Sequence, residues 1–122
     1  MFRVVHFEIP AENPEKSVEF YKNVFKWEIN QWSSEMKYWL IKTGENSPGI
    51  DGAIYSPDGP FNGVVNTIDI PDIEEYLGIV KSYGGEVVTD IMPIPGVGRF
   101  AYCKDPGGVL FGIIQNDPNV TV

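Results

Sequence analysis

The stretch Val4–Pro10, VVHFEIP, holds the only histidine of the chain, His6, two residues before the carboxylate of Glu8. Its β-branched residues predict a strand, and side chains two residues apart in a strand lie on the same face. An imidazole and a carboxylate on one face are suited to a metal site, an acid–base pair or a ligand contact. They are equally suited to a structural hydrogen-bonded pair, because buried polar groups normally bond to their neighbours. The sequence leaves both interpretations open.

Composition restricts the class of protein. The 122 residues fit one domain, and the 43% hydrophobic fraction is that of a packed protein. A net charge of −8 argues against a nucleic-acid partner, and Cys103, the single cysteine, rules out an intrachain disulfide and a cysteine-based zinc site. The first residues lack an apolar signal-peptide core, and no apolar run reaches the ~20 residues of a membrane span. We therefore expect a cytoplasmic protein without a nucleic-acid or membrane partner.

The order of predicted elements occurs twice along the chain. A strand ending at Pro10 precedes a helix that Asn13 and Pro14 start, and a strand ending at Pro71 precedes a helix that Asp72 starts. The apolar residues of the first helix that we expect to face a sheet are Val18, Tyr21, Val24 and Phe25. Three short strands are predicted after each helix, over 27–32, 37–44 and 49–56, and over 86–94, 98–105 and 108–115.

This repeat predicts one α+β domain made of two βαβββ modules, at about 1–57 and about 62–116, followed by a short C-terminal tail. The eight strands would form a mostly antiparallel cup with both helices on its outer face. The concave face then needs a cover, which side chains, a partner or a ligand would supply.

The segments HFEIPAENPEKSVEFYKNVFKW, YLGIVKSYGGEVV and DPGGVLFGIIQ resemble glyoxalase/bleomycin-resistance/extradiol-dioxygenase proteins, the vicinal oxygen chelate superfamily. The resemblance covers nearly the whole chain, and IMPIPGVGRFAYCKDPGGVLFGI is similar to an uncharacterised glyoxalase-like branch. It implies the duplicated fold and a homodimer. It does not imply one reaction, because the superfamily includes isomerases, dioxygenases, thiol transferases and drug-sequestering proteins.

The resemblance also implies where a divalent metal would bind, with one His or Glu ligand from each of the first, fourth, fifth and eighth strands. His6 matches the first position, whereas Gly112 stands where metal-dependent relatives have a glutamate. The fourth ligand position falls within 51–53, where only Asp51 has a ligating side chain, and the fifth falls at Val65 or Asn66. We therefore expect no family-type metal site. The alternative is a Zn, Ni, Mn or Fe site of altered composition that includes His6 and Glu8.

Several further side chains are candidates for the wall of the cup. Besides His6 and Glu8, the candidate ligand-binding residues are Trp32, Trp39, Asn66, Arg99 and Tyr102, with Tyr38 on one of the same strands. Each aromatic has a core alternative, and Arg99 has the alternative of a surface ion pair.

The sequence predicts a small-molecule binding protein without a metal. One alternative is a lyase, isomerase or dioxygenase-like enzyme that uses His6 and Glu8 as catalytic residues, with or without a metal. A second is a resistance protein that sequesters a cationic antibiotic, to which the negative charge is suited.

Overall fold

The computed structural model describes residues 1–57 and 63–121. Over these residues the chain forms two helices and nine strands and divides into two compact units. The N-terminal unit is His6–Val65, and the C-terminal unit combines Met1–Val5 with Asn66–Val122. No helix in the described part of the chain is long and apolar enough to cross a membrane.

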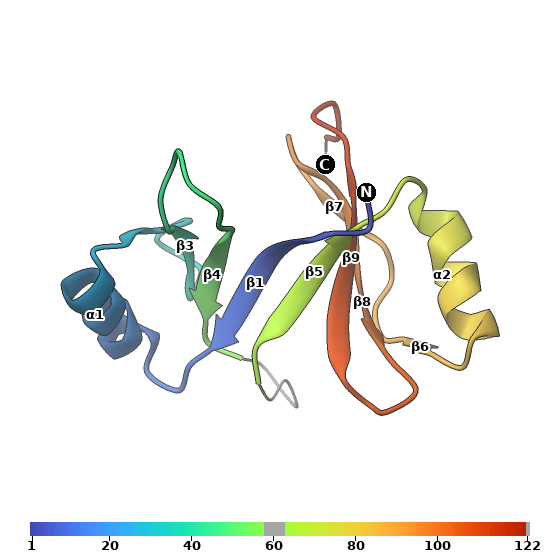
Figure 1. Cartoon of the computed structure of the whole chain (residues 1–122), viewed down its shortest axis with the longest axis horizontal. Coiled ribbons are helices and arrows are strands. Elements are labelled where there is room, and N and C mark those ends of the chain that lie inside the picture. Colours follow the sequence, from blue (N-terminus) through green and yellow to red (C-terminus); the bar gives the residue numbers. More distant parts are fainter. Residues whose placement is uncertain (58–62, 122) are drawn as a thin grey trace. The chain divides into compact units, whose positions relative to one another are not determined.

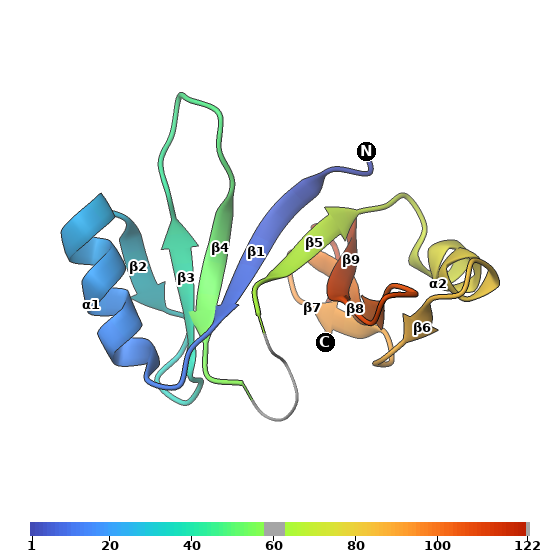
Figure 2. The ribbon, with the colours of Figure 1, turned by 60° about the horizontal axis from the view of Figure 1, so that its bottom comes forward.

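The N-terminal unit is a four-stranded sheet with one helix (Figures 1 and 2). Its elements are β1 (Val4–Pro10), α1 (Pro14–Phe25), β2 (Glu28–Gln31), β3 (Tyr38–Lys42) and β4 (Asp51–Tyr55), and β1 belongs to this unit from His6 onward. The strand order is β2-β3-β4-β1, in which β3 is antiparallel to both neighbours and β1 is parallel to β4.

Helix α1 begins as the sequence predicts. The Asn13 side chain accepts a hydrogen bond from the Lys16 amide (3.3 Å), and Pro14 occupies the first turn, where its missing N–H has no cost. The helix ends at Phe25 and is capped by Lys26, whose backbone is left-handed (φ 60°).

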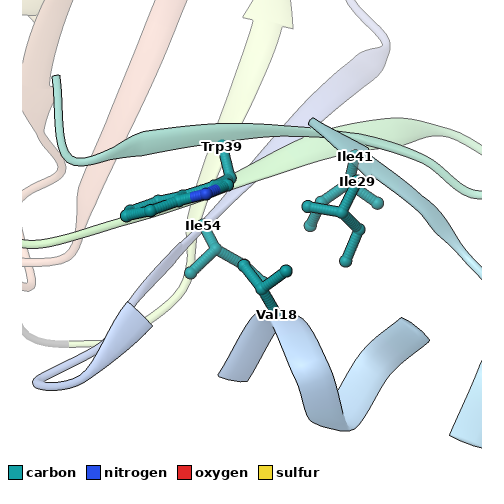
Figure 3. Packing of buried hydrophobic residues seen from close by; sticks show 5 residues of the cluster. All are labelled: Val18, Ile29, Trp39, Ile41 and Ile54. Carbon is teal, nitrogen blue, oxygen red and sulfur yellow. The ribbon is translucent and has the colours of Figure 1, made fainter. Parts of the chain in front are cut away.

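The core of this unit lies between α1 and one face of the sheet (Figure 3). Val18 of α1 packs with Trp39 and Ile54, and this buried cluster also contains Ile29 and Ile41. The expected apolar stripe is wrong at Val24 and Phe25, because both are more than half exposed.

The C-terminal unit repeats this arrangement. Its elements are β5 (Val65–Asp69), which belongs to this unit from Asn66 onward, α2 (Ile73–Ser82), β6 (Glu86–Val87), β7 (Met92–Ile94), β8 (Gly98–Lys104) and β9 (Leu110–Asn116). Strand β5 is parallel to β9, β9 is antiparallel to β8, and β6 and β7 both pair with β8. Asp72 caps α2 by accepting from the Glu75 amide (3.1 Å). Ile73, Ala101, Cys103 and Ile113 are among the residues of its core.

The single strand expected over 86–94 is divided into β6 and β7. The Val88 and Thr89 amides both donate to the Tyr102 carbonyl, and the Tyr102 amide donates to the Thr89 hydroxyl (3.0 Å). Thr89 therefore takes the place of a backbone partner, and the chain bulges before pairing resumes at Met92. The tail after β9 is hydrogen-bonded to the hairpin between β7 and β8, through Asp117 to Val97 and Gly96 to Val120.

The α+β fold class with two βαβββ modules is confirmed, and an offset of 59 residues relates β1, the start of α1 and β4 to β5, the start of α2 and β9. The matching features are the caps Asn13 and Asp72, the helix starts Pro14 and Ile73, and the hydrogen bonds Ala11 N–H to Tyr55 O and Ile70 N–H to Ile114 O. By this offset Glu8 matches Thr67, and Ala53 matches Gly112. The strand registers agree, because Glu8 pairs with Ala53 across β1 and β4 as Thr67 pairs with Gly112 across β5 and β9.

Candidate functional site

The sheet of the N-terminal unit has a second face, opposite the one that packs on α1. Alternation along the strands and the observed registers place His6 and Glu8 of β1, Tyr38 and Leu40 of β3, and Ala53 and Tyr55 of β4 on it. We call this surface the polar face. Its polar side chains are those of His6, Glu8, Tyr38 and Tyr55.

Glu8 lies at the centre of the polar face and is 5% exposed. Its Oε2 accepts a hydrogen bond from the Tyr38 hydroxyl at 2.8 Å, and the same hydroxyl lies 3.4 Å from His6 Nε2. Tyr38 therefore joins the imidazole and the carboxylate that the sequence singled out. A buried carboxylate with a hydrogen-bond donor beside it is a stable arrangement, whereas an unpaired one is costly.

The protons of this group can be assigned from its geometry. A phenol has one proton, and the shorter contact shows that Tyr38 donates it to Glu8. The contact with His6 is then a hydrogen bond only when His6 Nε2 carries a proton and donates it to Tyr38. In that tautomer His6 Nε2 is a donor and offers no lone pair to another ligand.

Burial is the largest cause of the pKa shifts of His6 and Tyr38. Desolvation lowers the pKa of His6, and the negative charges of Glu8 and Asp51 oppose this effect in part. Desolvation, the Glu8 charge and the hydrogen bond to Glu8 raise the pKa of Tyr38 far above its usual value. Tyr38 is consequently a permanent donor, and neutral His6 is the form that the fold favours.

Tyr55 adds a second phenol to the polar face. Its ring centroid lies 6.3 Å from that of Tyr38, and its pKa is raised first by burial and then by the charge of Glu8. Within the described residues its buried hydroxyl has no hydrogen-bond partner. A polar atom in this state is suited to a ligand or water that the chain itself does not supply.

The margin of the polar face is accessible and aromatic. Trp32 follows β2, is 47% exposed and packs edge-on against Tyr38 with ring centroids 5.5 Å apart, and Leu40 is 43% exposed. The sequence singled out Trp32, whereas Tyr55 was missed. The pairing of Glu8 with Ala53 puts Tyr55, two residues further along β4, on the same face, but this register cannot be read from the sequence.

The other sequence candidates do not lie on the polar face. Trp39 points toward α1 and is 8% exposed, so it is part of the core (Figure 3). Arg99 forms an ion pair with Glu74 of α2, which is the surface alternative. Asn66 is exposed and Tyr102 is half-buried, and both belong to the C-terminal unit.

The residue equivalences also test whether the chain fits a family-type metal. The offset of 59 assigns the fifth-strand position to Val65, matching His6, and the fourth-strand position to Ala53, matching Gly112. Asp51 is excluded from that position, and its carboxylate accepts from the Thr43 amide (2.8 Å). Of the four positions, His6, Ala53, Val65 and Gly112, only His6 has a side-chain atom that can ligate a metal.

Gly112 has no side chain that could ligate a metal, and the space beside it is already occupied. A Cβ built on Gly112 would lie 2.5 Å from Cζ of Phe100, so the Phe100 ring occupies the space that a longer side chain would need. In the described part of the chain no three His, Cys, Asp or Glu residues gather in a way that could hold a metal ion. The residues present do not fit the divalent-metal site that the family resemblance implies.

Comparison with known proteins identifies similar chains. The model of the Glyoxalase/Bleomycin resistance protein/Dioxygenase superfamily matches residues 3–113. A Mycobacterium tuberculosis protein provisionally named glyoxylase CFP32 is 26% identical over 117 residues, which cover 91% of this chain and 43% of that protein. The chain thus spans less than half of that relative. A Vibrio cholerae protein provisionally named lactoylglutathione lyase is 27% identical, with 93% of this chain and 91% of that protein covered.

Solved structures show the same fold. A superfamily member from Vibrio splendidus has a TM-score of 0.70 at 18% identity, covering 96% of this chain and 100% of that chain. Methylmalonyl-CoA epimerase from Mycobacterium tuberculosis has a TM-score of 0.66 at 14% identity, covering 93% and 87%. At these identities the likeness extends to the fold alone.

The first prediction concerns the hydrogen bond from Tyr38 to Glu8. We expect Tyr38→Phe to lower the free energy of unfolding by about 1–3 kcal/mol, because a buried carboxylate loses a donor. Urea denaturation monitored by circular dichroism measures this change. Tyr83→Phe is the control, since Tyr83 is 82% exposed and should leave stability unchanged. Equal stability of the two variants would contradict the assigned hydrogen bond.

The second prediction concerns pH. His6 has a folded-state pKa below its usual value of 6.5, so the unfolded chain takes up the proton first as pH falls. Stability should therefore decrease as pH drops below about 6.5 and level off once folded His6 is also protonated. His6→Gln should lack this component. Urea denaturation of both proteins between about pH 5 and pH 7.5 measures the difference, and parallel curves would contradict the prediction.

Proposed function

The chain belongs to the Glyoxalase/Bleomycin resistance protein/Dioxygenase superfamily, and on this premise we propose that it binds a small cationic molecule at the polar face without a resident divalent metal. The observation that carries the proposal is the hydrogen-bonded group of Glu8, Tyr38 and His6, placed beside exposed aromatic and apolar side chains. Small-molecule sites commonly combine apolar walls with a few fixed polar groups.

The charge of the polar face favours a cation. The strand registers place the carboxylates of Glu8, Glu28 and Asp51 on it, against one ammonium, that of Lys42. Lys42 is itself ion-paired with Glu45. A positive ligand group would therefore gain from the local field as well as from the net charge of −8.

The aromatic rings strengthen this preference. Trp32 and Tyr38 form an edge-on pair next to the buried Glu8, and Tyr55 extends the series of rings. Cations are attracted to the faces of Trp and Tyr, and the Glu8 carboxylate, which is hydrogen-bonded to the Tyr38 hydroxyl, adds to the attraction. Leu40 and Trp32, both exposed, would cover the apolar part of the ligand. Sequestration of a cationic antibiotic is one case of this activity.

The third prediction tests the proposal with choline and its uncharged carbon isostere, dimethylbutanol. We expect choline to shift the amide resonances of β1 and β3 in an NMR titration, and the isostere to have little effect. Glu8→Gln should weaken choline binding about tenfold, because a nearby unit charge contributes on the order of 1–3 kcal/mol at a protein surface. The control is Glu19→Gln, an exposed carboxylate of α1.

Two kinds of result in this titration would contradict the proposal. Equal affinity for choline and its isostere, or an equal effect of Glu8→Gln and Glu19→Gln, would contradict the cationic ligand. Binding to the wild-type protein with shifts confined to other strands would contradict the polar face as the site.

An enzyme that uses His6 and Glu8 with a metal is the alternative, and the names of the mycobacterial and Vibrio cholerae relatives support it. The fourth prediction decides between the two proposals. After stripping and refilling with Zn²⁺, Ni²⁺, Mn²⁺ or Fe²⁺, we expect elemental analysis to find no stoichiometric metal that depends on His6. A full equivalent in the wild type that His6→Ala removes would overturn the metal-free proposal.

We also propose that the chain pairs as a homodimer, as the family resemblance implies. Sedimentation equilibrium at micromolar concentration tests this, and a single species at the 13.6 kDa of the chain would contradict it.

A further inference from the structure

The outer edge of the N-terminal sheet is open. Strand β2 is the last strand of the order, and in the described part of the chain no further strand pairs with its outer side. The amide of Trp32, directly after β2, donates to the Tyr38 carbonyl (3.0 Å). Main-chain groups point alternately to the two sides of a strand, so Ile29 and Gln31 direct their N–H and C=O groups away from β3. Such a row of groups can pair with an added strand.

The C-terminal unit interrupts the corresponding part of its sheet. There β6 has two residues, and β7 has three, one of which is Pro93. The hydrogen bond of Thr89 to Tyr102 separates these two strands. Proline and bulges both prevent regular pairing at a sheet edge. Strand β2, with the sequence EINQ, has four residues in unbroken register with β3 and no proline, so its edge is regular.

A groove lies between this strand and α1, and Figure 2 shows α1 beside β2. Its volume is about 310 Å³, and the residues that line it include Glu15, Glu19, Lys22, Ile29, Gln31 and Trp39. Ile29 and Gln31 pair with Ile41 and Trp39, so their side chains lie on the sheet face that packs on α1. Any residue hydrogen-bonded opposite Ile29 or Gln31 would direct its side chain to the same face, into the groove.

Charges follow a fixed order along the groove. Glu15, in the first turn of α1, is ion-paired with Lys37, which directly precedes β3 (2.8 Å), so the start of α1 lies near the end of β2. Lys22 lies about two helical turns further on, toward the start of β2, and Glu19 lies between them. Within the described residues neither Glu19 nor Lys22 forms an ion pair. The groove therefore offers a carboxylate toward one end of β2 and an ammonium toward the other.

We propose that an extended segment of a partner protein binds along β2 as a further strand of this sheet, with a basic side chain opposite Gln31 and an acidic one opposite Ile29. The basic side chain faces Glu19, and the acidic side chain faces Lys22. Antiparallel pairing is slightly more stable per residue than parallel pairing, and in that direction the segment reads Lys-x-Glu. This surface is on the opposite sheet face from the polar face, so the proposal does not depend on the cationic ligand.

The experiment compares two peptides of equal composition and zero net charge. The probe is acetyl-Ser-Lys-Thr-Glu-Ser-amide, and the control is its isomer acetyl-Ser-Glu-Thr-Lys-Ser-amide. In NMR titrations we expect the probe to shift the amide resonances of α1 and β2. It should bind about fivefold more tightly than the isomer, because the isomer replaces two surface ion pairs with like-charge contacts.

A charge exchange in the protein tests the same order from the other side. Glu19→Lys with Lys22→Glu should reverse the preference, so that the isomer binds more tightly than the probe. The matched control is Lys81→Glu with Glu86→Lys, an exchange between exposed side chains of the C-terminal unit, which should leave the preference unchanged.

The main-chain pairing is tested by methylation of single peptide amides. The amide of the probe's Lys points toward β2, whereas that of its Thr points away. N-methylation at Lys should weaken binding about tenfold, because it removes a ladder hydrogen bond and keeps the strands apart. N-methylation at Thr should have little effect.

The proposal is overturned if neither peptide shifts α1 and β2 at millimolar concentration, if both isomers bind equally, or if the two methylated probes bind equally. A measurement without any peptide tests the open edge itself. We expect the amides of Ile29 and Gln31 to exchange with solvent faster than that of Asn30, which faces β3. Equal protection of the three amides would show that the edge is already occupied, and would also overturn the proposal.

Discussion

The buried carboxylate of Glu8 requires a hydrogen-bond donor, and this requirement links the polar face to the core on the other side of the same strands. Tyr38 reaches Glu8 only in the register that pairs it with Tyr55, and that register also places Trp39 against Ile54. A slip by one residue would turn Trp39 away from α1 and Tyr38 into the core. The apolar packing of Val18, Trp39 and Ile54 therefore fixes the geometry of a site that none of them touches.

The two units show how one backbone arrangement holds two kinds of chemistry. Both keep an apolar core between a helix and one sheet face, and both have a parallel pair of strands in the same register. Tyr38 pairs with Tyr55 as Phe100 pairs with Ile114, so the exchange of Tyr38 and Glu8 for Phe100 and Thr67 alters only the other face. Substitutions there leave the helix packing intact, which explains why a fold of this kind is a weak guide to function.

The sequence predicted the elements well where local chemistry decides them. Asn13, Pro14 and Asp72 gave the starts of both helices, because a cap or an N-terminal proline acts within one turn. The division of the strand over 86–94 was not predictable, since it depends on a hydrogen bond between Thr89 and the distant Tyr102. Tyr38 and Glu8 are likewise 30 residues apart, and their contact follows from a register that the sequence does not state.

The fifth-strand metal position stayed open between Val65 and Asn66, because the sequence alone does not fix how the two modules align. Pro10 and Pro71 look equivalent because each ends an apolar strand, but they are 61 residues apart, whereas the helix caps are 59 apart. The caps are the better reference, because the hydrogen bonds from β1 to β4 and from β5 to β9 follow the same offset.

With that reference the difference from a metal-binding relative is larger than one lost glutamate. Ala53, Val65 and Gly112 occupy three of the four positions, and the Nε2 of His6 faces the Tyr38 hydroxyl. A metal ion would compensate inward-facing negative charge by coordination, whereas here a neutral phenol stabilises the Glu8 carboxylate. A neutral donor leaves the negative charge of Glu8 in place, and the proposed cationic ligand would interact with that charge.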